Sequence, residues 1–136
     1  MGKPEISFDV FGEPAPQGSK TIMRGRLVEA SSKKLKPWRK AVTLAAMAHL
    51  EDSGVAFLDD AVEITIKFYV RRGTTVKRLL PTVPSDLDKL IRAVNDSLTD
   101  AQVWNDDSQV VKLTAFKVYA DNREPGAFIQ IAKYNG

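Results

Sequence analysis

The sequence contains no cysteine and only one histidine, His49. The absence of cysteine excludes disulfide bonds, thiolate nucleophiles, and zinc or iron–sulfur sites built on thiolates. A single histidine also excludes a zinc site built from several imidazoles. His49 lies in the apolar run AVTLAAMAHL, so we interpret it as a structural residue on a helix face.

Long hydrophobic runs are absent as well. No stretch approaches the roughly 20 uninterrupted apolar residues of a membrane-spanning helix, and the start, MGKPEISFDV, lacks the order of a secretory signal. We therefore expect a soluble, cytoplasmic protein without membrane contact. With 136 residues, 43% of them hydrophobic, the chain has the length of one packed domain. We predict a single domain over residues 1–136, without repeats or linkers.

The net charge of +3 is unevenly distributed. Residues 1–50 carry nine Lys/Arg and four Asp/Glu, whereas residues 86–107 carry two basic and six acidic residues. This pattern is typical of a protein that places a polyanion on its basic surface and reserves the acidic segment for a cation. An ordinary solvated surface is the alternative, and charge alone does not decide between them.

Apolar periodicity predicts the strands and helices of an α/β (α+β) domain, for which we expect a small mixed β-sheet with two main helices packed on it. The predicted strands are residues 6–12, 61–70, 108–120 and 126–134. The predicted helices are 38–50, with Pro37 at or just before the first turn, and 86 to about 98. Residues 21–30 read as a short strand or hairpin arm, from which Arg24 and Arg26 project to one side because their spacing is two. Residues 71–84 read as a loop.

The second helix carries an acidic face. With Leu87, Leu90, Ile91, Val94 and Leu98 directed to the core, Asp88, Arg92 and Asn95/Asp96 form a stripe elsewhere on the helix. Asp86 precedes it, where capping of backbone N–H groups is an alternative role.

Carboxylates at two positions of this segment suit a divalent ion. Asp86 and Asp88 are two residues apart, and Asp106 and Asp107 follow about twenty residues later. Oxygen ligands of this kind suit Mg²⁺, and crowded carboxylates repel one another without a cation. We expect these carboxylates to converge at one open pocket, although D-x-D spacing by itself is common in surface loops.

The stretch PSDLDKLIRAVNDSLTDAQVWNDDSQV, residues 84–110, resembles the signature of the RusA-type Holliday junction resolvases. In that family D-x-D-N-L-x-K-A-x-x-D-x-L is followed by a short segment and D-D-x-Q-[IV]. The resemblance implies a RusA-like fold and a homodimeric, Mg²⁺-dependent endonuclease of branched DNA such as four-way junctions, with Mn²⁺ as an alternative ion. It assigns catalysis and metal binding to Asp86, Asp88 and Asp107, with Asp106 as an adjacent ligand.

The chain departs from the signature at the family's lysine, where it has Arg92. Arginine keeps the charge but is a poor general base. Lys89 stands where the family has asparagine, and it is rotated by about 100° from Asp88 on a helix. We favour Arg92 as the electrostatic partner of the carboxylates and place Lys89 facing solvent or DNA.

Lysine and arginine make the phosphate contacts that supply most sequence-independent DNA affinity. The loop at 71–84 ends just before Asp86 and would bring DNA to the metal. We expect Trp38 and Trp104 to be buried rather than stacked on bases. The candidate DNA contacts are Lys20, Arg24, Arg26, Lys33, Lys34, Lys36, Arg71, Arg72, Lys77, Arg78 and Lys89.

Two other functions stay open. A non-catalytic branched-DNA-binding protein of the same fold is favoured by Arg92 in the lysine position and opposed by the intact acids. A carboxylate-metal phosphohydrolase of nucleotides would not need so many basic residues. A two-fold dimer is expected on physical grounds too, because a four-way junction requires two matched cuts.

Overall fold

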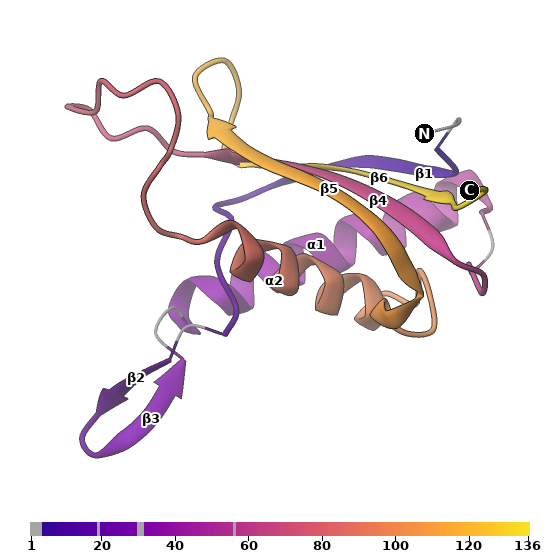
Figure 1. The fold of residues 1–136 in the computed structure, drawn as a ribbon, viewed down its shortest axis with the longest axis horizontal. Coiled ribbons are helices and arrows are strands. Elements are labelled where there is room, and N and C mark those ends of the chain that lie inside the picture. Colours follow the sequence, from indigo (N-terminus) through magenta and orange to yellow (C-terminus); the bar gives the residue numbers. More distant parts are fainter. Residues whose placement is uncertain (1–3, 19, 30–31, 56) are drawn as a thin grey trace.

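The computed structural model describes residues 4–18, 20–29, 32–55 and 57–136. A four-stranded sheet has both helices on one of its faces, and a two-stranded hairpin projects from this body (Figure 1). The strand order is β1-β6-β4-β5, with β4–β5 parallel and the other two pairs antiparallel. The sheet strands are β1 (Ile6–Phe11), β4 (Val62–Val70), β5 (Val110–Tyr119) and β6 (Gly126–Lys133). The predicted α+β class, with a mixed sheet and two helices, is confirmed.

Helix α2 (Leu87–Asp100) forms the crossover between the parallel strands β4 and β5. Parallel neighbours require such a crossover, and its helix runs back along the sheet against the strand direction. The start of α2 therefore lies toward the carboxyl ends of β4 and β5, and its end lies toward their amino ends. This topology decides where the acidic residues of the segment are placed.

The core lies between the sheet and the two helices. Ile64, Ile66 and Phe68 alternate along β4 and are at most 1% exposed, and Leu90 of α2 lies in the same cluster. Burying such side chains contributes about 1.5–3 kcal/mol each. Trp38 and Trp104 are buried as expected. None of the described helices combines the length and apolar character needed to cross a membrane.

Helix α1 (Ser32–Ser53) begins earlier than the predicted start at Trp38 and contains Pro37. The prediction was wrong because it treated proline as a boundary. Leu35 is buried together with Trp38, so the apolar face extends into the first turn and stabilises it, while Pro37 removes only one backbone hydrogen bond near the helix start. The lysines at positions 33, 34 and 36 consequently lie on α1 and not before it.

The segment at 21–30 forms a hairpin of β2 (Lys20–Met23) and β3 (Arg26–Glu29). Arg24 and Gly25 are its two turn residues, with φ of 52° and 77°. Positive φ at both positions is typical of a type I′ turn, which suits the twist of a two-residue hairpin. Because Arg24 occupies the turn, the prediction that strand spacing directs Arg24 and Arg26 to one side was wrong.

The sheet face opposite the helices carries alternating cations and aromatic rings. The Lys67 ammonium lies 5.2 Å from the ring centre of Tyr69 and 5.3 Å from that of Phe116. The Arg123 guanidinium lies 4.1 Å from Tyr69 and 4.9 Å from Phe11. On this face, which no helix covers, the aromatic rings are therefore partly covered by cationic side chains.

Candidate metal and DNA site

The start of α2 presents two carboxylates to solvent. Asp86 is the N-cap residue, with φ −71° and ψ 140°, but its side chain accepts no capping hydrogen bond. Its side chain is 60% exposed, and Asp88 in the first turn is exposed as well. The capping role considered for Asp86 is therefore absent, which leaves the oxygen atoms of both carboxylates accessible to a cation.

Asp107 lies beyond the other end of α2, where it begins the short 3-10 helix η1 (Asp107–Gln109) just before β5. Its neighbour Asp106 is the N-cap of η1. The Asp106 carboxylate accepts a hydrogen bond of 3.0 Å from the Ser108 N–H, and the Gln109 side chain completes a capping box. Hydrogen bonds from Ser108 lower the pKa of Asp106. Asp106 thus has a structural role, which its spacing of three from Gln109 could have indicated, because this is the spacing of a capping box.

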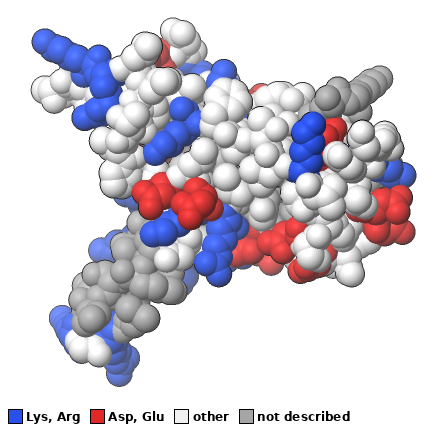
Figure 2. All heavy atoms as spheres, viewed as in Figure 1, with Lys and Arg blue, Asp and Glu red and all other residues white. Residues whose placement is uncertain are grey.

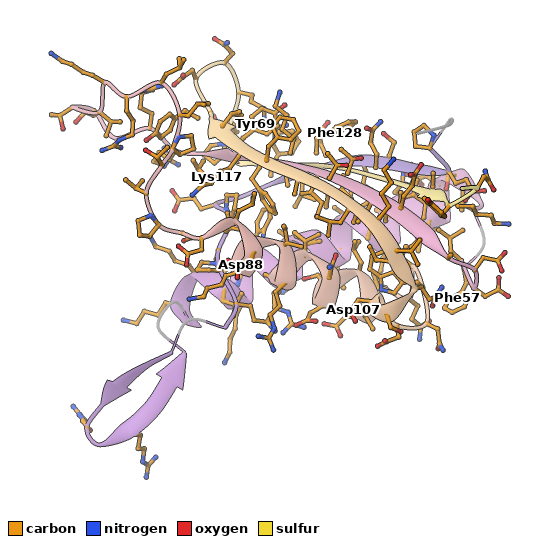
Figure 3. All side chains as sticks on the ribbon, viewed as in Figure 1. Phe57, Tyr69, Asp88, Asp107, Lys117 and Phe128 are labelled. Atoms are coloured by element: carbon orange, nitrogen blue, oxygen red, sulfur yellow. The ribbon has the colours of Figure 1, made fainter. Side chains whose placement is uncertain are left out.

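The two acidic groups are separated by the length of α2. A helix of 14 residues spans roughly 21 Å, and Figure 3 shows Asp88 and Asp107 at its opposite ends. Within the part of the chain that the structure describes, no three acidic or histidine side chains are arranged to hold a metal ion. The expected convergence of Asp86, Asp88 and Asp107 within one chain is therefore wrong, because the crossover places Asp86 and Asp88 toward the carboxyl ends of β4 and β5 and places Asp107 toward their amino ends.

The cation beside the exposed carboxylates is Lys89. Its Nζ lies 3.8 Å from Oδ2 of Asp86, and its side chain is 36% exposed. Arg92 is exposed and lies against Gly18, where a Cβ would come within 3.1 Å of its Nη1. No ion pair joins Arg92 to a carboxylate of the described residues. Lys89 is therefore the electrostatic partner of Asp86, and the preference for Arg92 in this role was wrong.

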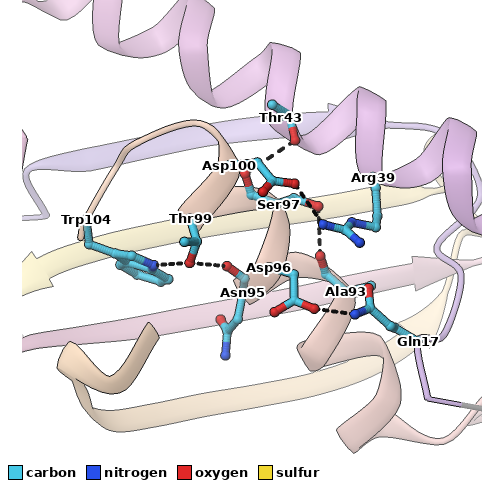
Figure 4. A network of polar contacts seen from close by, with 10 residues as sticks. All are labelled: Gln17, Arg39, Thr43, Ala93, Asn95, Asp96, Ser97, Thr99, Asp100 and Trp104. Atoms are coloured by element: carbon cyan, nitrogen blue, oxygen red, sulfur yellow. Dashed lines mark hydrogen bonds and ion pairs between the residues drawn. The ribbon is translucent and has the colours of Figure 1, made fainter. Parts of the chain in front are cut away.

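Polar contacts fix α2 against α1 and against the turn at residues 12–18 (Figure 4). The Gln17 side chain donates to Asp96, and its backbone N–H donates to the carbonyl oxygen of Lys89 at 3.0 Å. Arg39 of α1 pairs with Asp100 at 2.7 Å. Asp96, which the acidic stripe included, is thus bound within the fold. Nothing in the pattern around Gln17 indicated this role.

The loop between β4 and α2 is organised by Arg72. Its Nε and Nη2 atoms donate to the two carboxylate oxygens of Asp121 at 2.8 and 3.1 Å, and Nη1 donates to the carbonyl oxygens of Val76 and Arg78. Its guanidinium also lies 4.1 Å from the ring centre of Tyr119. The pair with Asp121 raises the pKa of Arg72 and lowers that of Asp121. Arg72 therefore stabilises the conformation of the loop, although the sequence analysis predicted that it contacts DNA.

Two other basic residues of this loop also have protein partners. Arg71 donates to Glu13 at 2.7 Å, which raises the pKa of Arg71, and Arg78 donates to the hydroxyl of Tyr119 at 2.8 Å. Lys77 is exposed. Arg71 and Arg78 line a cavity of about 370 Å³ together with Lys34 of α1 and Ser85, the residue before Asp86.

The cavity thus joins two of the predicted basic groups beside the acidic start of α2. Figure 2 shows basic side chains on either side of the acidic ones over this part of the molecule. The Lys20 side chain lies outside the described residues. The remaining candidate DNA contacts outside the loop, apart from Lys89, are all exposed: Arg24, Arg26, Lys33, Lys34 and Lys36.

In the comparison with protein families, the model of a family described as Endodeoxyribonuclease RusA matches residues 12–132, from just after β1 almost to the end of β6. Comparison with curated proteins gave no match.

Proposed function

Because the chain belongs to the RusA endodeoxyribonuclease family, we propose that it is a Mg²⁺-dependent, structure-selective endonuclease acting on four-way junctions or related branched DNA. The observation that carries this proposal beyond the family is the start of α2. There the Asp86 and Asp88 carboxylates are accessible, next to a cavity whose lining includes four basic side chains and Glu13. This combination supports a metal-assisted reaction on a polyanion.

The donor set of these residues fits a hard divalent ion. Carboxylate oxygens with free lone pairs are the ligands that Mg²⁺ and Mn²⁺ accept, and Mg²⁺ is commonly held by one or two of them together with water and substrate phosphate. Asp86 and Asp88 would hold the ion, and Asp107 of a second chain, with Asp106 beside it, would be a further ligand. When bound, the ion would supply Lewis-acid chemistry at the scissile phosphate.

The basic residues of the chain would position the DNA strand. Lys89 offsets the repulsion between the two carboxylates, since its ammonium lies 3.8 Å from Asp86. Lys34, in the lining of the cavity that Ser85 also lines, and Lys77, in the loop before α2, are exposed, so each is available to neutralise a phosphate. Arg92, on the exposed side of α2, would orient the phosphate by charge without acting as a base.

A homodimer supplies what a single chain lacks. If a two-fold axis passes near the middle of α2, Asp107 of the partner comes to the Asp86–Asp88 end of the first chain, and the reverse holds at the second site. Each dimer would then contain two complete sites related by symmetry, which suits paired cuts in a four-way junction.

The surface beside α2 supports such a dimer. Strand β5 is an edge strand of the four-stranded sheet, and Val111 and Leu113 on it are 58% and 39% exposed. Leu79 and Leu80 of the loop before α2 are exposed at 82% and 51%. Apolar residues left exposed along a sheet edge are typical of a surface that a partner covers.

Cleavage of labelled synthetic DNA tests the proposal. Four-way junction, linear duplex and single strand are incubated with the protein and either Mg²⁺ or a chelator. Paired nicks in the junction, obtained only with metal, are expected. A nuclease that cuts linear duplex as well as the junction would contradict structure selectivity.

A non-catalytic branched-DNA-binding protein is the second candidate. One observation favours it: no group of three carboxylates forms within the described part of a single chain. In the same assay it would retard the junction in a gel without cutting it, whether or not metal is present. Release of phosphate from nucleotides, without attack on DNA, would instead indicate a phosphohydrolase.

A further inference from the structure

Lys117 occupies an unusual place for a lysine. It pairs in register with Phe68, which is fully buried on the helix-facing side of the sheet, and neighbours in register share a face. The Lys117 side chain is half-buried. Placing an ammonium on the core side of a sheet is costly unless its donors find partners.

The partners of Lys117 are backbone carbonyls of the segment that enters α2. Its Nζ donates to the carbonyl oxygen of Val83 at 2.8 Å and to that of Ser85 at 2.7 Å. Figure 3 places Lys117 between the end of β5 and this segment. Short bonds from a charged donor are among the stronger ones in proteins. Lys117 therefore ties the last residues before Asp86 to the rigid sheet.

Asp86 depends on this attachment more than an ordinary N-cap does. A capping hydrogen bond would fix its carboxylate to the helix, but the side chain makes none, and among the described residues its one ion pair is with Lys89 at 3.8 Å. The direction of the Asp86 carboxylate is thus set chiefly by the backbone at Ser85 and Asp86. That backbone is held from one side by Lys117 and from the other by the bond from the Leu90 N–H to the Asp86 carbonyl.

The rest of the loop does not supply this restraint. Arg72 holds its earlier part, through the carbonyls of Val76 and Arg78. Between these residues and Val83 the side chains of Leu79 and Leu80 are exposed, although Pro81 is buried. Of the side-chain attachments of the described loop, the one made by Lys117 is the nearest to Asp86, and beyond Asp88 the Gln17 N–H donates to the carbonyl oxygen of Lys89.

We propose that Lys117 is a positioning residue for the Asp86 and Asp88 carboxylates. It fixes the backbone that orients them, so that they are arranged to receive a divalent cation before DNA binds. This inference rests on the proposed function for the identity of the site. It assigns to Lys117 no contact with DNA and no part in proton transfer.

Lys117→Met tests the proposal, because methionine keeps most of the volume and removes the donors. Amide hydrogen exchange of the metal-free protein, read by mass spectrometry, is expected to become faster over residues 83–90. The metal concentration for half-maximal junction cleavage is expected to rise by about 10- to 100-fold, the effect typical of removing a residue that orients ligands. Lys117→Arg keeps the positive charge and has N–H donors for both carbonyl oxygens, so this variant should restore much of both properties. Lys133→Met, an exposed lysine on β6, is the matched control and should change neither.

Several results would overturn the proposal. If Lys117→Met lowers the melting temperature but leaves the metal requirement unchanged, Lys117 is only structural. If it weakens junction binding without metal and reduces the salt dependence of that binding, Lys117 contacts phosphate instead. Unchanged exchange over residues 83–90 would also contradict it. Exchange is measured without metal or DNA, so it reports on the role of Lys117 even if the wild-type protein does not cut junctions. That failure to cut would contradict only the proposed function.

Discussion

At the residue scale, Asp86 and Asp106 show how one residue type at one kind of position serves two purposes. Both are N-cap residues, but only the Asp106 carboxylate turns back to accept a backbone hydrogen bond. Capping by aspartate contributes about 0.5–2 kcal/mol. Asp86 forgoes this contribution and keeps its oxygens exposed, which is expected of a residue retained for binding rather than for stability.

Asp88→Asn is expected to abolish junction cleavage and to preserve or strengthen junction binding. The substitution removes a metal ligand and one negative charge near the DNA phosphates, and it does so at an exposed position. Cleavage with Mg²⁺ and gel retardation without it measure the two properties separately. The control is Glu51→Gln, because Glu51 is an exposed acid near the C-terminal end of α1. A variant that fails to bind would count against the metal-ligand role.

The sequence indicated which acids are candidates for the site but not the contacts that they make. The acids stand out because they are concentrated in a basic chain. The helical rotation of about 100° per residue correctly separated Lys89 from Asp88, but it was not applied to Asp86. Residues three apart are neighbours on a helix, and the long Lys89 side chain reaches Asp86 in this way. A Cβ at position 18 would lie 3.1 Å from Nη1 of Arg92, and Gly18 has φ of 98°, a turn conformation that no periodicity reveals.

At the scale of elements, the loop before α2 is held by charged groups that respond to pH. The Asp121 pKa is lowered by Arg72, so the pair stabilises the fold above the ordinary carboxyl pKa of roughly 3.9. Its contribution is lost as pH falls through the lower pKa that Asp121 has in the folded protein.

Asp121→Asn should therefore be less stable than wild type at neutral pH, and the difference should shrink in acid. Melting temperatures of both proteins, measured across this pH range, provide the test. Asp59→Asn, another exposed acid, is the matched control because no ion pair joins Asp59 to the described residues. A difference between wild type and Asp121→Asn that stays constant with pH would show that the ion pair is not its source.

The hairpin of β2 and β3 is expected to act as a DNA-contacting arm. Arg24 and Arg26 are exposed at its turn, away from the body of the molecule (Figure 1). Replacing both with alanine should weaken junction binding and reduce the slope of log affinity against log salt by about 2, since each phosphate contact contributes about 0.9. Fluorescence anisotropy over a salt series measures this slope. The double variant Lys40→Ala/Lys133→Ala, which removes two exposed lysines elsewhere, should leave the slope nearly unchanged.

Element types followed from the sequence because burial imposes a period. The alternation along β4 predicted its buried face correctly, and the spacing of Leu90, Val94 and Leu98 did the same for α2. The start of α1 did not follow, because proline is typical of the first turn of a helix, whereas tertiary packing of Leu35 extends this helix to residues before Pro37. The pairing of β4 with β5, and hence the crossover, did not follow either, because strand and helix periodicity describe each element alone and not which strands pair.

At the scale of the whole molecule, the crossover separates carboxylates that are close in sequence. A metal site completed between two chains makes a specific prediction for mixed dimers. Asp88→Asn and Asp107→Asn proteins should each be inactive alone. After subunit exchange, half of the sites in a mixed dimer contain both mutations and the other half contain neither.

The mixture should therefore nick the junction, without the paired cuts of wild type. Exchange is verified with differently tagged subunits, and the products are resolved on a denaturing gel. Mixing Asp88→Asn with a chain that carries both substitutions is the control, because no intact site results. Persistent inactivity of the first mixture, despite proven exchange, would show that the acids do not act across an interface.

The length of α2 has a consequence for the cell. If the 14 residues of α2 keep the acids of each chain too far apart to bind one ion, a newly made monomer cannot cut DNA until it dimerises. Nuclease activity would then depend on protein concentration, with no inhibitor required.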